Sequence, residues 1–335
     1  AIPVLLFWLV CPGDAAMQRG IAIPMATDIA FSLGVLSVFK TRVPIGLKVF
    51  LAALAVADDL GGIIVIALFY SSHIDMMFLI LSAVCVAVMV IGNFFKCRAK
   101  FFYVLVGLVL WYTMLNSGIH STIAGVITAF CIPSTLKNGT GHYLERIREN
   151  VGKFPVIDID DRHNTIVLTH DQIHTLKSIE SAADKMISPL QDLEDNLHGL
   201  INFFIIPLFA FANAGIDMSQ MSFGSLFSGV GLAVMIGLVV GKFLGVFSFS
   251  WIAIKLKIVQ LPAHTTWKAF ASVCVVCGIG FTVSMFIADL SYAGLGADGA
   301  ALLAQAKLGV LVGSVISALL GCLLLGKTLP AEVKK

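Results

Sequence analysis

Charged residues are scarce in this sequence. Of its 335 residues, only 13% are Asp, Glu, Lys or Arg, whereas 58% are hydrophobic. A soluble domain carries about a quarter charged residues. No soluble fold of this length would cover so much apolar surface with so few charges, so we infer that the chain folds in a lipid bilayer. Membrane lipid is therefore an expected partner, and nucleic acid is not.

Strict alternation of apolar and polar residues is also missing, which argues against a membrane β-barrel. Long apolar runs are present instead. Only helices or closed barrels satisfy the backbone in lipid, so the runs predict an all-α polytopic membrane protein. The expected spans are 1–10 (partial), 21–39, 45–71, 76–95, 101–115, 118–132, 199–215, 223–254, 267–289 and 302–326.

The first run is too short for a membrane helix, which needs about 20 residues. The sequence opens with Ala1 rather than Met, directly inside this run. We therefore expect the helix to begin before residue 1 and the chain to be a fragment.

Seven cysteines are scattered through the apolar runs, and Cys274 and Cys277 form a C-x-x-C pair. Neither a second pair nor nearby polar ligands accompany them. We interpret them as small packing residues and expect no cofactor.

The basic residues are distributed very unevenly. Of the 22 Lys and Arg residues, 19 lie in every second connection or in the C-terminal tail, and only Arg19 lies in the opposite connections. The positive-inside rule places the loop 133–198 and the C-terminus in the cytoplasm. We expect four parts: membrane helices in 1–132, a cytoplasmic loop with an amphipathic helix in 133–198, membrane helices in 199–326, and a tail in 327–335.

Ionisable residues within the predicted spans are the clearest functional signal, because such groups are costly in lipid. Asp58 and Asp59 are adjacent and flanked by two apolar turns on either side. Burial and a neighbouring carboxylate both favour the protonated form, so such a group holds a proton at modest pH and releases it in mild alkali. The bare carboxylate is then a hard ligand for a small cation. Proton and cation would compete for one site.

Two spans carry helix breakers. Pro24 precedes Thr27 and Asp28, and the second span contains the run 277–282, Cys-Gly-Ile-Gly-Phe-Thr. Unwound backbone is tolerated at membrane depth where it lines a cavity. The half-helix ends would present partial charges, and Asp28 could balance two positive ones.

Two lysines also lie within spans. Lys242 lies within a stripe of small residues formed by Gly237, Gly241 and Gly245, so we interpret it as structural, with an ammonium that can reach the cytoplasmic interface. Lys307 lies nearer the outer end of the last span, where we expect a functional or ion-pairing role.

The order of these features repeats. A broken span followed by a span with buried charge occurs at 21–39 and 45–71, and again at 267–289 and 302–326. The first broken span runs toward the cytoplasm and the second away from it. Such inverted repeats are typical of secondary transporters.

The sequence resembles the NhaA family of bacterial sodium/proton antiporters, which is itself among the transporters on which the inverted-repeat rule rests. The matching stretches keep the family's order along the chain. They are Ala26–Phe31, Ala57–Gly61, Leu208–Gly215, Cys277–Thr282 and Ala306–Gly309.

This resemblance implies roles for individual residues. Asp59 would be the principal ligand of the transported Na⁺ and a proton carrier. Asp58 would also contact Na⁺, pair with Lys307 and share in the proton cycle. Thr27, a further Na⁺ contact, and the charge-compensating Asp28 would lie where the broken helices cross. His198 matches a position tied to pH response.

The resemblance also implies a bacterial inner-membrane antiporter that exports Na⁺ or Li⁺ in exchange for H⁺ by alternating access. The family's first two helices are missing from this sequence, so a homodimer is possible but its contact element is absent. The loop 133–198 is longer than the family pattern predicts.

Other classes of membrane protein fit less well. An intramembrane aspartyl protease needs Gly-x-Gly-Asp, but Phe281 follows Gly280. A membrane prenyltransferase needs Asp-Asp-x-x-Asp, and no third carboxylate follows Asp59 at that spacing. A proton- or sodium-coupled carrier of an organic solute remains an alternative, and a metal-dependent intramembrane enzyme is less favoured.

Overall fold

The computed structural model describes residues 2–12, 15–69, 75–135, 140–154, 169–213, 215, 229–292 and 295–329, and all regular secondary structure in these ranges is helical. The chain forms two compact units, one from residues 1–71 and 202–335 and the other from 72–201. Residues 1–71 thus pack with residues 202–335, far away in the sequence.

The first unit contains both broken spans. Its helices are α1 (Ile2–Val10), α2 (Ala15–Gln18), η1 (Arg19–Met25), α3 (Ile29–Ser37), η2 (Lys40–Arg42), α4 (Ile45–Phe69), α11 (Ile206–Asn213), α12 (Gly229–Ile236), the π-helical turn η6 (Gly237–Gly241), α13 (Lys242–Lys255), α14 (Trp267–Val276), α15 (Phe281–Tyr292) and α16 (Gly296–Thr328).

The described helices are those of a multi-pass membrane protein. Five of them are long and apolar enough to cross a bilayer, and the number rises to seven if each of two bent helix pairs is one span. The spans expected at 76–95, 101–115 and 302–326 correspond to helices with boundaries within a few residues, apart from an earlier start for the last.

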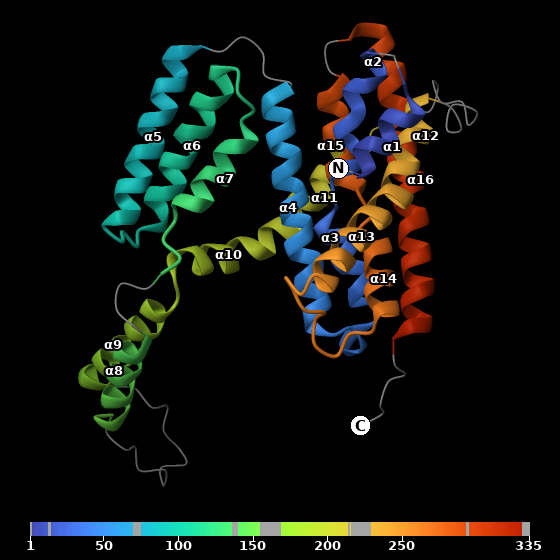
Figure 1. Cartoon of the computed structure of the whole chain (residues 1–335). Helices are drawn as coiled ribbons and strands as arrows, with labels where there is room; N and C mark the ends of the chain where they lie inside the picture. Colours follow the sequence, from blue (N-terminus) through green and yellow to red (C-terminus); the bar gives the residue numbers. More distant parts are fainter. Residues whose placement is uncertain are drawn as a thin grey trace. The chain divides into compact units, whose positions relative to one another are not determined.

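Two spans of the first unit are bent at the positions that the helix breakers predict, and each consists of two helical segments. The segments Ala15–Met25 and Ile29–Ser37 meet at 41°, and Trp267–Val276 and Phe281–Tyr292 meet at 42°. The first pair descends from α2 to α3 in Figure 1, whereas the second rises from α14 to α15. The two broken helices therefore run in opposite directions, as inverted repeats require.

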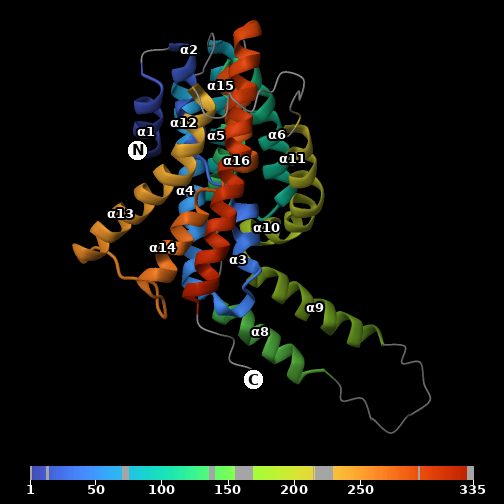
Figure 2. The same ribbon diagram turned by 90° about the vertical axis from the view of Figure 1, so that its right-hand side faces the viewer.

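Helix α16 supports the second broken helix along its length. It packs against α12, α14 and α15 and runs beside them in both ribbon views (Figures 1 and 2). At Gly309 a Cβ would come within 2.4 Å of the Gly231 carbonyl oxygen. Only glycine permits this close approach of the α16 and α12 backbones.

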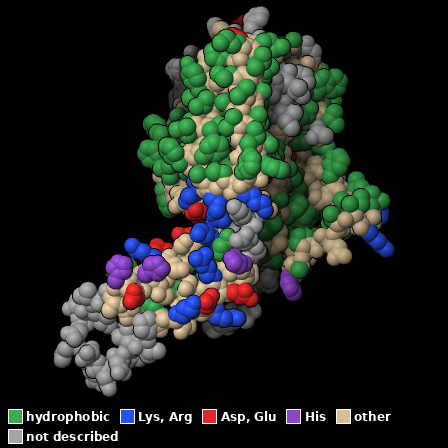
Figure 3. All heavy atoms as spheres, turned by 90° about the vertical axis from the view of Figure 1, so that its left-hand side faces the viewer, with side chains coloured by type: hydrophobic (Ala, Val, Ile, Leu, Met, Phe, Trp, Pro, Cys, Tyr) green, Lys and Arg blue, Asp and Glu red, His purple; other side chains and the backbone are tan. Residues whose placement is uncertain are grey.

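The second unit has its own core, built by α5 (Met76–Phe94), α6 (Lys100–Ser117) and the shorter α7 (Thr122–Cys131). Met89, Tyr103 and Leu110 are fully buried there. Apolar side chains cover the outer surface of these helices, and Lys and Arg side chains gather where that surface ends (Figure 3). This arrangement is typical of the boundary between hydrocarbon and water.

The loop expected at 133–198 contains α8 (Thr140–Gly152), α9 (His170–Met186) and most of α10 (Pro189–Leu200), after which the π-helical turn η3 (Ile201–Ile205) leads to α11. Helices α9 and α10, in the part of the chain where the amphipathic helix is expected, are separated by Ile187 and Ser188, directly before Pro189. Arg98 donates hydrogen bonds to the carbonyl oxygens of Asp184, Lys185 and Ile187, which fixes the end of α9 to the α5–α6 turn.

Candidate functional site

The broken helices cross at their unwound segments and bond to one another there. The chain is extended before α3, and the Asp28 amide donates to the Ile279 carbonyl oxygen at 2.7 Å. The Thr27 hydroxyl lies 3.1 Å from the carbonyl oxygen of Cys277, at the end of α14. Backbone groups that a continuous helix would satisfy internally are thus satisfied by the other broken helix.

Asp28 joins the N-termini of two half-helices. Its Oδ1 accepts from the Phe31 amide of α3, and its Oδ2 accepts from both the amide and the hydroxyl of Thr282 on α15, at 3.0 and 2.5 Å. The residue is 2% exposed. A buried carboxylate at two positive helix ends has the geometry that charge compensation requires.

Asp58, on α4, lies beside this crossing and pairs with Lys242. Lys242 Nζ lies 2.5 Å from Asp58 Oδ2 and donates to the Thr27 hydroxyl at 2.8 Å. The same hydroxyl lies 3.1 Å from Asp58 Oδ2. Side-chain exposure is 3% for Lys242 and 27% for Asp58. A buried lysine without such partners would pay a large desolvation cost.

Local structure explains how Lys242 reaches this position. The π-helical turn Gly237–Gly241 directly precedes it, and such turns are frequent at functional sites. A Cβ at Gly237 would come 2.7 Å from Pro24, and one at Gly241 would come 2.8 Å from Pro3. The stripe of small residues therefore packs closely, as predicted, and brings Lys242 alongside the first broken helix.

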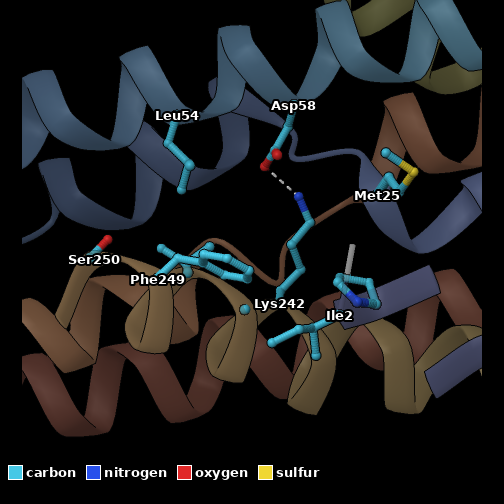
Figure 4. A pocket seen from close by; sticks show the side chains of 10 residues that line it. Ile2, Met25, Leu54, Asp58, Lys242, Phe249 and Ser250 are labelled. Atoms are coloured by element: carbon cyan, nitrogen blue, oxygen red, sulfur yellow. Dashed lines mark hydrogen bonds and ion pairs between the residues drawn. The ribbon is translucent and has the colours of Figure 1, made fainter. Parts of the chain in front are cut away.

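A cavity of about 220 Å³ opens beside the ion pair. Asp58 and Lys242 point toward one another across it in Figure 4, with Leu54, Met25 and Phe249 around them. The apolar wall and the single ion pair leave few polar groups to hold water or an organic solute.

Asp59 lies one residue further along α4, and its Oδ1 is buried without a hydrogen-bond partner in the described part of the chain. The charges of Lys242, Asp58 and Asp28 act on its carboxylate, and the Thr27 amide donates toward it. A buried carboxylate oxygen normally has a hydrogen-bond partner, and a cation or a proton bound to Asp59 would satisfy this one.

The predicted pair between Asp58 and Lys307 is wrong. Lys242 holds Asp58, whereas Lys307 Nζ lies 2.9 Å from Asp289 Oδ1. The position of a lysine within a span indicates its depth but not its partner, and the glycine neighbours of Lys242 indicated a packing role. Asp289 stood at the end of an expected span and was not singled out. The available signal for this ion pair was the presence of an acidic residue, Asp289, in the span before the one that contains Lys307.

His198 lies on α10 in the second unit and is exposed. Nothing in the structure tests its role in pH response, which stays a prediction.

The oxygen atoms gathered at the crossing are carboxylate, hydroxyl and carbonyl oxygens from Asp58, Thr27 and Cys277. Such hard donors suit small hard cations. They lie where two oppositely directed helices are interrupted, beside the buried Lys242, which pairs with the Asp58 carboxylate. Fold and site together define a secondary transporter of the inverted-repeat class, not an enzyme.

Comparison with known proteins identifies the family. Residues 1–325 match the family model described as Na⁺/H⁺ antiporter 1. The chain is 49% identical over 333 residues to the Na⁺/H⁺ antiporter NhaA of Bacteroides thetaiotaomicron, covering 99% of this chain and 74% of the relative. Identity to the Na⁺/H⁺ antiporter NhaA of Shewanella sediminis is 42%, covering 98% of this chain and 70% of the relative. The chain belongs to the NhaA family of Na⁺/H⁺ antiporters.

Proposed function

We propose that this protein exchanges Na⁺ for H⁺ at Asp58 and Asp59, with Li⁺ as an alternative cation. The observation that carries the proposal is the Asp58 carboxylate, which the Lys242 ammonium and the Thr27 hydroxyl hold where the broken helices cross. The neighbouring Asp59 oxygen has no partner within the described residues. The two carboxylates together provide a place for a cation and a place for a proton.

The exchange follows from competition for these oxygens. In the cation-free state Asp59 carries a proton, and Lys242 neutralises Asp58. When Na⁺ arrives, Asp59 releases its proton, and Asp58 exchanges part of its contact with Lys242 for contact with the cation. The Thr27 hydroxyl serves both states, because it accepts from Lys242 in one and offers a lone pair to Na⁺ in the other. Lys242 thus takes the role that the family resemblance implied for Lys307.

Alternating access requires that the site face each side of the membrane in turn. The crossing suits this requirement, since backbone polar groups there bond between the broken helices and can exchange partners. We further propose that Asp28 keeps the two half-helix N-termini together throughout the cycle. Orientation follows the distribution of Lys and Arg, with the loop 133–198 and the C-terminus in the cytoplasm and the protein in the bacterial inner membrane.

The test is Na⁺-driven proton movement in vesicles that contain the purified protein and a pH-sensitive dye. Asp59→Asn removes the proton carrier at nearly constant volume, and it should abolish the flux while the protein stays inserted. Asp298→Asn, an exposed acid in the first turn of α16, is the matched control and should retain the flux. Proton movement driven by an organic solute, but not by Na⁺ or Li⁺, would establish the alternative carrier instead.

A further inference from the structure

Helices α15 and α16 are joined by polar contacts at two levels. At the first level, the Ser314 hydroxyl oxygen on α16 accepts from the amides of Gly280 and Phe281 at 3.3 and 3.1 Å, at the start of α15. At the second level, Lys307 on α16 pairs with Asp289 on α15 at 2.9 Å. Exposure is 9% for the Lys307 side chain and 34% for that of Asp289.

The two levels are separated by a similar length of both helices. Ser314 and Lys307 are seven residues apart on α16, and Phe281 and Asp289 are eight residues apart on α15. Seven or eight residues make about two helical turns, so the two contacts lie about two turns apart along both helices. The two helices run in opposite directions, and the two contacts therefore fix both their register and their rotation.

Helix α16 can act as the fixed partner in this pair. Its Gly309, two residues after Lys307, rests against the backbone of Gly231 on α12 with no room for a side chain. Shifting α16 at this level would force two backbones together. Because α16 has no room to shift at this level, a change in the contact between Lys307 and Asp289 would move α15 and not α16.

The first turn of α15 is also the turn that holds Asp28. The Thr282 amide and hydroxyl both donate to Asp28 Oδ2, and the Asp28 amide bonds to Ile279, two residues before α15 begins. A rotation or slide of α15 would move these donors away from the crossing. Thr27, the neighbour of Asp28, contacts Asp58 directly.

We propose that the Asp289–Lys307 ion pair positions the transport site by clamping α15 on α16 and so holding Thr282 against Asp28. The pair touches neither of the two carboxylates assigned to the transported ions, and its effect passes through α15. Burial of the Lys307 ammonium costs desolvation free energy, and fixing the register of two helices is the best-attested role of such a pair. The transport readout below rests on the proposed function, whereas the exchange readout does not.

The experiment compares Lys307→Met, Lys307→Arg and Asp289→Asn with the unaltered protein. Lys327→Met, an exposed lysine in the last turn of the same helix, is the matched control. Hydrogen exchange is followed for the amides of residues 280–282. The clamp predicts about tenfold faster exchange in Lys307→Met, which corresponds to about 1.4 kcal/mol, a smaller increase in Lys307→Arg, and no change in Lys327→Met.

Transport in vesicles supplies the second readout. The clamp predicts that Lys307→Met raises the apparent KM for Na⁺ several-fold more than it lowers kcat, and that Lys307→Arg recovers most of the loss. Asp289→Asn keeps the volume and an oxygen acceptor, so it carries the test if Lys307→Met does not fold, and it should shift both readouts in the same direction.

Three results would overturn the proposal. Unchanged amide exchange at 280–282 in both Lys307→Met and Asp289→Asn would show that the pair does not hold the start of α15. A lower melting temperature with an unchanged KM would assign the pair to stability alone. Equal loss in Lys307→Arg and Lys307→Met would show that charge in this position does not matter. Failure of the unaltered protein to move protons with Na⁺ would refute the proposed function, while the exchange result would still decide the clamp.

Discussion

Replacement of Lys242 by methionine tests the ion pair at the crossing. The change removes the ammonium at similar side-chain length and leaves the Asp58 carboxylate without its cation. Breaking a buried pair costs about 3–5 kcal/mol. Because the Asp58 side chain is 27% exposed, solvent recovers part of that cost, and we expect a value near the lower end, about 3 kcal/mol. For a unit of about 200 residues this corresponds to a drop in Tm of about 6–12 °C.

The assay is thermal unfolding of the purified protein in detergent. Lys255→Met is the matched control, because Lys255 ends the same helix, is exposed, and has a cation–π contact with Trp251 at 4.7 Å. Loss of that contact costs about 0.5–1 kcal/mol. Adding Asp58→Asn to Lys242→Met removes the stranded charge and should restore part of the lost stability. Equal losses for the two lysine variants, or no recovery in the double variant, would refute the buried pair.

Two further predictions concern packing and the Asp28 bridge. Gly309→Ala forces a Cβ to within 2.4 Å of the Gly231 carbonyl oxygen, so it should lower the unfolding free energy by about 1–3 kcal/mol. The control Gly34→Ala meets open space within α3 and should leave the unfolding free energy unchanged or raise it by up to about 1 kcal/mol. Equal effects of the two variants in unfolding measurements would contradict the close contact at Gly309. Thr282→Val keeps the side-chain shape but removes a donor to the Asp28 carboxylate, and it should cost about 1.5–3 kcal/mol in the same assay, whereas no loss would show that this hydroxyl does not support Asp28.

The sequence predicted much of the fold because membrane helices follow simple physical rules. Length and apolarity located the spans, and the helix breakers at Pro24 and in 277–280 located both interruptions. Asp28 was expected at two positive helix ends, and its side chain does bond to the N-termini of α3 and α15. The bends follow from local chemistry, namely a missing proline amide and glycines that leave room for close contacts, and local chemistry can be inferred from neighbouring residues.

The partner of Asp58 could not be predicted in the same way. Position in a span indicates how deep Lys242 and Lys307 lie in the membrane. It does not indicate how their helices are rotated or which residues of other helices contact these lysines. Rotation at Lys242 depends on a π-helical turn, which no local sequence rule specifies. Contacts at the crossing are equally hard to predict, because they join residues far apart in the sequence, such as Thr27 and Cys277, which are 250 positions apart.

Competition between Na⁺ and H⁺ for Asp58 and Asp59 is the central step of the proposed exchange. The most direct test is the apparent KM for Na⁺, measured with kcat between about pH 6 and pH 9. Below the apparent pKa of the coupled pair, each unit of acidification should raise KM about tenfold for each competing proton. Saturating Na⁺ should then restore the rate in acid. A constant KM with a steeply changing kcat would contradict competition at these carboxylates and would place the pH dependence in a separate conformational step.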